Sequence, residues 1–305
     1  YASYPRIPGH EFSAQIVEIG ENDRGLKPGM IVTCNPYFNC QKCYSCERGL
    51  VNCCESNETM GAQRDGAFSE YITMPIERIY DGMGLNPRQL ALIEPFCISY
   101  HGVSRADIKK GDKVLVIGAG TIGVLAAVAA KAKGGEVYIA DIAEEKLQYA
   151  YKTFGLAGTI KNDSEESLKN SVSQITGEHH GFDVCIEAVG LPSTFQNCID
   201  AAAYGGRIVL IGVGKKNLDF NFTLIQKKEL SIFGSRNALK ADFKELIELV
   251  KCGEIDLEKI VMNKGSADAA KRSEYELEEA AAAFEEFHQY GGSKLKVLIH
   301  FSDPS

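Results

Sequence analysis

Four cysteines between residues 40 and 54 form the most specific chemical pattern in the chain. Cys40, Cys43, Cys46 and Cys54 follow the spacing C-x2-C-x2-C-x7-C. Four thiolates at this spacing are typical of a tetrahedral zinc site that has no open coordination position. Because a closed site cannot bind substrate, we expect it to hold a loop in place. A redox-active set of cysteines is the alternative interpretation.

A histidine and two glutamates could hold a second zinc ion. His10 and Glu11 lie in the segment RIPGHEF, and Glu94 lies in LIEPF. Zinc accepts imidazole and carboxylate ligands, and a catalytic site keeps one position open for water or substrate. Taken singly, the three residues have ordinary alternatives: a buried core histidine, a salt-bridge partner, and a carboxylate stabilised at a helix N-terminus.

A glycine pattern over residues 116–123, VIGAGTIG, could bind a dinucleotide. Gly118, Gly120 and Gly123 stand in the order G-x-G-x-x-G between an expected strand and an expected helix. The first glycine permits a tight turn, the second lets the backbone approach the pyrophosphate, and the third lets the helix pack close to the sheet. We include Thr121 and Ile122, at the start of this helix, among the cofactor-binding residues. An ordinary strand–helix turn is the alternative.

An acidic residue at the end of the next expected strand completes the dinucleotide pattern. Asp141 lies 23 residues after Gly118. Its carboxylate would accept hydrogen bonds from both ribose hydroxyls and repel a 2′-phosphate, which favours NAD over NADP. Lys146, one turn into the following helix, could contact the ribose or pair with a surface carboxylate.

The segments between these motifs predict an α/β chain of two parts. Short β-rich runs in the first part, at residues 13–20, 29–35 and 67–74, indicate an antiparallel β domain up to about residue 95. Later, buried runs alternate with helices, which predicts a doubly wound parallel sheet. The expected strands are residues 113–117, 137–141, 183–187, 207–211 and 229–233, with a helix at 122–133. The expected C-terminal elements are helices at 242–251 and 275–288, a polar loop or loose helix start at 264–272, and a strand at 294–301.

Length and composition exclude several classes of protein. A chain of 305 residues is longer than one core usually supports, which predicts two domains. The net charge of −8 argues against nucleic-acid binding, which needs a clustered basic surface, and therefore against a nucleic-acid-binding zinc ribbon. No apolar run has the length of a membrane span.

Five of the ten cysteines lie between residues 40 and 54, and no secretory signal is recognisable. This distribution favours metal binding in a reducing, cytoplasmic compartment over disulfides. Cys53 is the spare cysteine of the cluster. The cysteines expected to be small buried hydrophobic residues are Cys34, Cys97, Cys185, Cys198 and Cys252.

In their order along the chain, these motifs resemble the zinc-dependent medium-chain dehydrogenases of the alcohol dehydrogenase superfamily. The resemblance rests on PGHEF, the cysteine cluster, DGAFSEY at residues 65–71 and GAGTIG, and it covers nearly the whole chain. LIEPF at residues 92–96 is similar to the polyol branch, which includes sorbitol dehydrogenases. SRN at residues 235–237 most resembles its sugar-acid, galactonate-type members.

The resemblance implies a GroES-like, β-rich catalytic domain of residues 1–98 and 236–305 and a Rossmann NAD-binding domain of residues 99–235. It implies that His10, Glu11 and Glu94 bind a catalytic zinc, while the four clustered cysteines bind a structural zinc. The implied reaction is the oxidation of a secondary alcohol of a polyol or sugar acid to a ketone, through a zinc-bound alkoxide and hydride transfer to NAD. Relatives suggest a homodimer or homotetramer.

One part of the family pattern is missing from this sequence. The family places a cysteine ligand and a proton relay, in a motif similar to I-C-G-[ST]-D-x-H, a couple of dozen residues before the His-Glu pair. The chain begins at Tyr1 without a methionine, so we expect it to lack its natural N-terminus and to have an incomplete catalytic zinc shell. The alternative function is a catalytically inactive dinucleotide-binding protein that retains the structural zinc.

Arg236 follows the last expected strand of the cofactor domain. Its guanidinium could bind a cofactor phosphate or the carboxylate of a sugar acid, because bidentate pairing suits both anions. An ordinary ion pair at the surface or between domains is the alternative.

Overall fold

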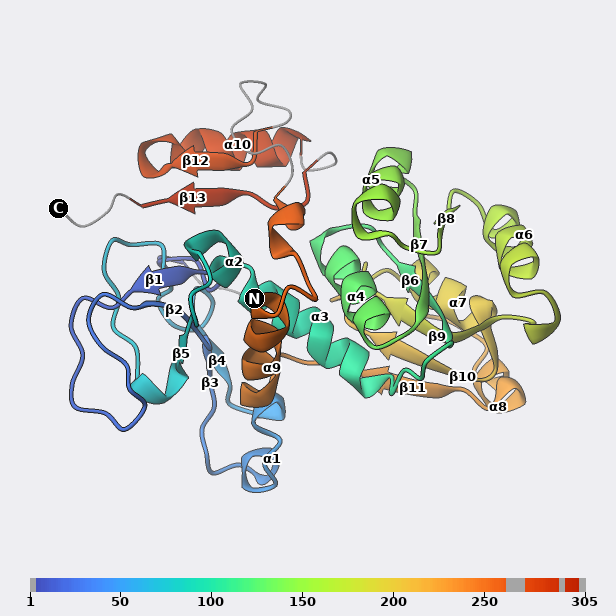
Figure 1. Ribbon diagram of the computed structural model, residues 1–305. Coiled ribbons are helices and arrows are strands. Elements are labelled where there is room, and N and C mark those ends of the chain that lie inside the picture. Colours follow the sequence, from blue (N-terminus) through green and yellow to red (C-terminus); the bar gives the residue numbers. More distant parts are fainter. Residues whose placement is uncertain (1–3, 262–271, 291–293, 302–305) are drawn as a thin grey trace. The chain divides into compact units, whose positions relative to one another are not determined.

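The computed structural model describes residues 4–261, 272–290 and 294–301. The chain divides into two compact units (Figure 1), one formed by residues 1–97 and 237–305 and the other by residues 98–236. We call them the catalytic unit and the cofactor unit, after the roles that the resemblance implies. The polar stretch expected at residues 264–272 lies outside the described residues, apart from Arg272.

The cofactor unit contains a six-stranded sheet in which every neighbouring pair of strands is parallel. Its strand order is β11-β10-β9-β6-β7-β8. The chain therefore starts in the middle of the sheet, fills one side and then crosses to fill the other, which is the doubly wound order of a Rossmann fold. The strands are β6 (Lys113–Ile117), β7 (Glu136–Asp141), β8 (Gly158–Lys161), β9 (Phe182–Glu187), β10 (Ala202–Leu210) and β11 (Ser231–Gly234).

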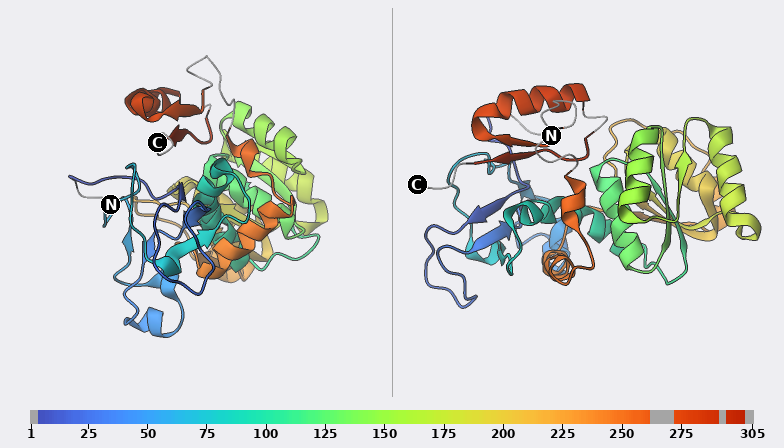
Figure 2. Two further views of the ribbon diagram at one scale, coloured as in Figure 1. Left: turned by 60° about the vertical axis from the view of Figure 1, so that its left-hand side comes forward. Right: turned by 45° about the horizontal axis from the view of Figure 1, so that its top comes forward.

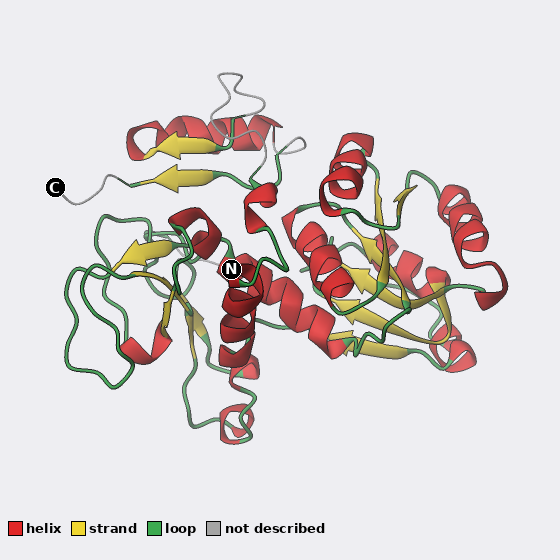
Figure 3. Cartoon of the chain, in the orientation of Figure 1, coloured by secondary structure: helices red, strands yellow, loops and turns green. Residues whose placement is uncertain are grey.

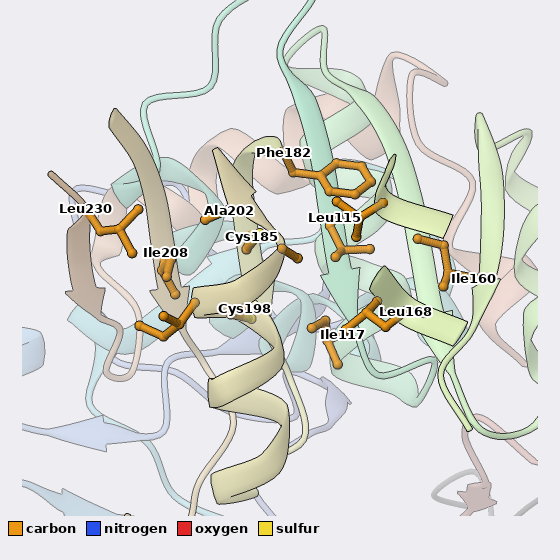
Figure 4. Packing of buried hydrophobic residues seen from close by; sticks show 14 residues of the cluster. Leu115, Ile117, Ile160, Leu168, Phe182, Cys185, Cys198, Ala202, Ile208 and Leu230 are labelled. Atoms are coloured by element: carbon orange, nitrogen blue, oxygen red, sulfur yellow. The ribbon is translucent and has the colours of Figure 1, made fainter. Parts of the chain in front are cut away.

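The predicted parallel sheet is confirmed, and its central strands β6 and β9 are buried on both faces. Side chains such as Leu115, Phe182, Cys185 and Cys198 form one hydrophobic cluster between strands and helices (Figure 4). Helices pack on both faces of this sheet (Figure 3). The helices of this unit are α4 (Thr121–Ala132), α5 (Glu144–Phe154), α6 (Glu165–Thr176), α7 (Pro192–Ala201) and α8 (Thr223–Lys228), and α3 (Ile93–Arg105) leads into it.

The catalytic unit begins with short antiparallel strands, as predicted. β1 (Ser13–Gln15), β2 (Ile31–Cys34) and β5 (Ile79–Asp81) form a three-stranded sheet. β3 (Tyr37–Phe38) pairs with β4 (Glu58–Thr59). Side chains of Ile16, Leu26 and Val32 are among those of the small core that this sheet covers. The helices here are α1 (Tyr44–Glu47), α2 (Pro87–Ala91) and the start of α3.

The C-terminal part of the catalytic unit differs from its prediction. The helix expected at residues 275–288 begins only at α10 (Ala280–Tyr290), because the preceding residues form the strand β12 (Glu274–Glu276). β12 pairs in parallel with β13 (Leu298–His300), which is shorter than the expected strand at 294–301. Figure 2 shows α10 packed over this strand pair. The expected helix at 242–251 is α9 (Lys240–Lys251).

Two further expectations were wrong. Residues 67–74 do not form a strand, because the backbone N–H groups at residues 66–68 bond to an irregular segment that contains Pro8. Cys252 is exposed just after α9, whereas the other four cysteines expected in the interior are buried. Among the described residues, no helix combines the length and the apolar composition that crossing a membrane requires.

Candidate functional site

The four clustered cysteines converge in the catalytic unit. α1 and a 3₁₀ turn at Val51–Cys53 fold the segment back on itself, so that the sulfur atoms of Cys40, Cys43, Cys46 and Cys54 lie within 4.8 Å of one another. The sulfurs of Cys43 and Cys54 are 4.0 Å apart. Zinc–sulfur bonds of about 2.3 Å in a tetrahedron separate the sulfurs by roughly 3.8 Å. The four thiols therefore fit a zinc ion with little movement.

Backbone amides donate hydrogen bonds to sulfur atoms of this cluster and favour their negatively charged form. Hydrogen bonds from the amides of Glu55 and Cys46 lower the pKa of Cys43 to about 6. Burial raises the pKa of Cys54 to about 11, although the amide of Cys40 donates to its sulfur over 3.2 Å. The side-chain amide of Asn39 approaches the sulfur of Cys46 at 3.7 Å. Such donors stabilise thiolates, which are the form that binds metal.

His10, Glu11 and Glu94 also converge in the catalytic unit, although they are distant in sequence. Each offers a ligand atom, and these atoms lie within 4.8 Å of one another. His10 and Glu11 lie in the coil before β1, and Glu94 is buried in the first turn of α3. One imidazole and two carboxylates form a donor set that suits a divalent cation such as zinc.

The protonation of these groups follows from their burial. Burial, and then the charge of Glu11, raise the pKa of Glu94, which the Tyr37 hydroxyl opposes by donating a hydrogen bond to its carboxylate. Burial lowers the pKa of His10, which favours the neutral imidazole that metals require. Lys296 forms an ion pair with Glu11. The salt bridge that the sequence offered as an alternative role for Glu11 is therefore present in the structure.

A short turn holds the histidine segment in place. The amides of Gly66, Ala67 and Phe68 donate to the carbonyls of Ile7, Gly9 and Pro8 over 2.7, 2.9 and 3.0 Å, respectively. This support was not predicted from the sequence, and neither were the contacts of Tyr37 and Lys296. The residues that Tyr37 and Lys296 contact lie 57 and 285 positions away along the chain, so no local spacing rule reveals them.

The glycine-rich loop has the predicted local geometry in the cofactor unit. Gly118 follows β6 with a φ of +109°, and Gly120 caps α4, whose first residues are Thr121 and Ile122. A Cβ at Gly123 would lie 2.8 Å from the carbonyl carbon of Gly118, so only glycine lets the helix approach the turn this closely.

Asp141 ends β7 beside this loop. Its carboxylate oxygens accept hydrogen bonds from the amides of Ala119 at 2.6 Å and Ala143 at 2.9 Å. The acidic side chain is therefore fixed against the backbone of the glycine-rich turn. Lys146 lies in the first turn of α5, and the exposed Arg236 follows β11. Because β7 and β11 belong to one parallel sheet, Asp141 and Arg236 both lie at its carboxyl edge.

Glu187 is a further residue of this edge that the sequence analysis did not single out. It is buried at the end of β9, where its carboxylate accepts hydrogen bonds from the amides of Val189 and Gly190 and from the hydroxyl of Thr194. The turn that it fixes packs against the glycine-rich loop, since a Cβ at Gly118 would lie 2.7 Å from the Val189 side chain. Glu187 thus supports the loop from the next strand.

Comparison with protein families matches both units of the chain. Residues 1–82 match the alcohol dehydrogenase GroES-like domain, and residues 121–251 match the zinc-binding dehydrogenase domain. The chain is 37% identical over 264 residues to L-galactonate-5-dehydrogenase of Escherichia coli K12, covering 87% of this chain and 77% of that protein. It is 32% identical to sorbitol dehydrogenase of Halalkalibacterium halodurans, covering 85% of this chain and 76% of that protein.

Solved structures agree with this assignment. A short chain alcohol dehydrogenase from Escherichia coli CFT073, in complex with NADH, matches with a TM-score of 0.87 and 29% identity over 98% of this chain and 85% of that one. Galactitol-1-phosphate dehydrogenase from Escherichia coli matches with a TM-score of 0.82 and 28% identity over 94% of this chain and 82% of that one. The chain therefore belongs to the zinc-dependent alcohol dehydrogenase family, in its polyol and sugar-acid branch, and is an oxidoreductase.

Proposed function

We propose that this protein oxidises a secondary alcohol of a sugar acid or polyol to a ketone, with NAD as the hydride acceptor. The observation that carries the proposal is the convergence of His10, Glu11 and Glu94 ligand atoms within 4.8 Å, in a chain that also holds a complete dinucleotide loop. The relative with 37% identity is named for L-galactonate, which favours a sugar acid over a neutral polyol.

His10, Glu11 and Glu94 would hold the catalytic zinc, and the four clustered cysteines would hold a structural zinc. When bound, the catalytic ion supplies Lewis-acid polarisation of the substrate hydroxyl. Tyr37 orients Glu94 through its hydroxyl, and Lys296 neutralises Glu11, so that two carboxylates can lie together beside the histidine.

Asp141 would select NAD. A carboxylate fixed by the Ala119 and Ala143 amides keeps a free lone pair on each oxygen for the ribose hydroxyls, and it repels a 2′-phosphate. The pyrophosphate would lie against the loop glycines, Thr121 and Ile122, where the positive potential at the N-terminus of α4 attracts it.

Arg236 would bind the carboxylate of a sugar acid. It is exposed at the carboxyl edge of the sheet, and a guanidinium pairs with a carboxylate through two parallel hydrogen bonds. We expect Arg236→Ala to reduce kcat/KM for a sugar acid far more than for a neutral polyol. Equal losses on both would contradict this role and indicate a contact with the cofactor.

The test of the proposed function is NADH formation with L-galactonate, sorbitol and L-threonine, measured on zinc-loaded protein with NAD and with NADP. We expect turnover with the sugar acid and NAD, loss of turnover in His10→Ala, and little change in Cys53→Ser. NADH binding without turnover on any of these compounds, by a preparation that holds two zinc ions per chain, would instead indicate a dinucleotide-binding protein that is not a dehydrogenase. The same preparations, weighed by light scattering, test our further proposal of a homodimer or homotetramer.

A further inference from the structure

A buried carboxylate fixes the turn that follows β9 at the carboxyl edge of the parallel sheet. Glu187 ends β9, and only 3% of its surface is exposed. Its Oε1 atom accepts hydrogen bonds from the amides of Val189 and Gly190, over 2.9 and 2.8 Å, and from the Thr194 hydroxyl, over 2.6 Å. Hydrogen bonds to ionised groups are shorter and stronger than bonds between neutral groups. The turn after β9 and the first turn of α7 are therefore held firmly to the end of the strand.

The same glutamate lies against the turn that follows β10. The amide of Gly212 donates to the backbone carbonyl of Glu187 over 3.0 Å, and a Cβ at Gly212 would overlap the second carboxylate oxygen. A Cβ at Gly190 would lie 2.6 Å from the carbonyl carbon of Val213. Because these close approaches leave no space for one turn to shift alone, the turns after β9 and β10 form one packed unit around Glu187.

These paired turns, residues 188–190 and 212–214, lie on one side of the glycine-rich loop. The strand order is β11-β10-β9-β6-β7-β8, so the loop after β6 separates them from the end of β7. Asp141, the expected partner of the adenosine ribose, ends β7 on the other side. A dinucleotide whose pyrophosphate lies at the loop extends to both sides, so its nicotinamide nucleoside would lie over the paired turns. Val189 and Val213 offer apolar side chains there, and they are 41% and 77% exposed.

The glycine-rich loop has supports of its own on the β7 side. The amide of Gly118 donates to the carbonyl of Ala140 over 2.8 Å, and the carboxylate of Asp141 accepts from the amide of Ala119. These contacts keep the loop anchored to β7 when the paired turns move. A change at Glu187 should therefore affect the paired turns far more than the loop.

We propose that Glu187 is a positioning residue for NAD, which holds the paired turns in the shape that receives the nicotinamide nucleoside. The proposal rests on the use of NAD in the proposed function. Glu187 acts through the turns, since its buried Oε1 atom is already occupied by the chain's own donors. It raises the fraction of molecules in which the turns are correctly placed before the cofactor binds, and the apparent affinity falls in proportion when that fraction falls.

The test is isothermal titration calorimetry with NADH and with ADP, which lacks the nicotinamide nucleoside. Glu187→Gln keeps the shape of the side chain and removes its charge. We expect this variant to raise the Kd for NADH by roughly fivefold to twentyfold, and the Kd for ADP by less than about twofold. Thr194→Val removes one donor to the carboxylate and should raise the Kd for NADH by about threefold to tenfold. Thr194→Ser keeps the hydroxyl and should retain the wild-type Kd.

Glu165→Gln is the matched control, because Glu165 is an exposed carboxylate in the first turn of α6 of the same unit. It should change neither Kd. The proposal is overturned if Glu187→Gln and Thr194→Val bind NADH as the wild type does. It is equally overturned if they lose affinity for NADH and ADP by the same factor, because Glu187 would then only stabilise the unit as a whole.

The two Thr194 variants decide by the same criteria if Glu187→Gln does not fold. Thr194→Val should then weaken the binding of NADH and spare that of ADP, whereas Thr194→Ser should do neither. Nucleotide binding requires neither a substrate nor a catalytic zinc ion. A failure of the dehydrogenase proposal, seen as absence of turnover, is therefore distinguishable from a failure of this one.

Discussion

Replacing Gly66 with alanine should displace the histidine that we propose as a zinc ligand. A Cβ built at Gly66 would lie 2.5 Å from the carbonyl carbon of Pro8, and closer still to the carbonyl oxygens of Pro8 and Gly9. Contacts below 3.0 Å are essentially never found for a real Cβ, so the two segments must separate by at least about 0.5 Å. His10 is the next residue along the displaced segment.

The size of the effect follows from the hydrogen bonds between these segments. They are now 2.7, 2.9 and 3.0 Å long, and a separation of this size moves two of the three beyond the normal range. The loss of two or three such bonds, with overpacking, should lower the free energy of unfolding by about 1–3 kcal/mol. Misplacement of a catalytic group by about 1 Å costs about a hundredfold in rate, so we expect a loss in kcat/KM of about tenfold or more.

The assay combines thermal unfolding, zinc content per chain and NADH formation. Gly20→Ala is the matched control in the same unit, because a Cβ there meets no atom within 4 Å. We expect Gly66→Ala to lower the melting temperature, the zinc content and the rate, while Gly20→Ala leaves all three unchanged. If both variants retain the wild-type rate and zinc content, the turn at residues 66–68 does not position His10.

Three further substitutions test other parts of the structure. Gly123→Ala should raise the Kd for NADH by about tenfold or more, because the new Cβ would press against the glycine-rich turn. An unchanged Kd in a fluorescence titration with NADH would refute the close approach of the helix to this turn. Tyr37→Phe should destabilise the protein by about 1–3 kcal/mol in denaturant unfolding, because it leaves the buried Glu94 without its hydroxyl donor; a loss below about 0.5 kcal/mol would contradict that contact. Cys43→Ser should remove one zinc per chain and lower the melting temperature, whereas Cys53→Ser should do neither, as measured by metal analysis and calorimetry.

The local motifs of this chain could be predicted from the sequence because their geometry depends on neighbouring residues. The turn at Gly118 and the helix that starts after Gly120 follow from a strand, three glycines and a helix within a short stretch. The four cysteines likewise converge because a loop of fifteen residues can fold back on itself. The buried runs of the parallel strands were also recognisable, since both faces of that sheet are covered.

Irregular segments misled the prediction. Residues 67–74 have the composition of a strand, yet their backbone partners lie in a segment where proline and glycine prevent a regular ladder. The residues before Ala280 have helical composition, but pairing with β13 draws Glu274–Glu276 into a strand. In both places long-range pairing overrides local preference.

The sequence by itself determined the fold class, the cysteine site and the dinucleotide loop, because each depends on patterns of residues that lie close together along the chain. Only the tertiary structure decided which groups surround the second candidate metal site. It brings Glu94 to His10, places the Tyr37 hydroxyl on that carboxylate, and pairs Glu11 with Lys296, which is 285 positions away. Contacts over such separations depend on how complete elements pack together, and no spacing rule along the chain encodes that packing.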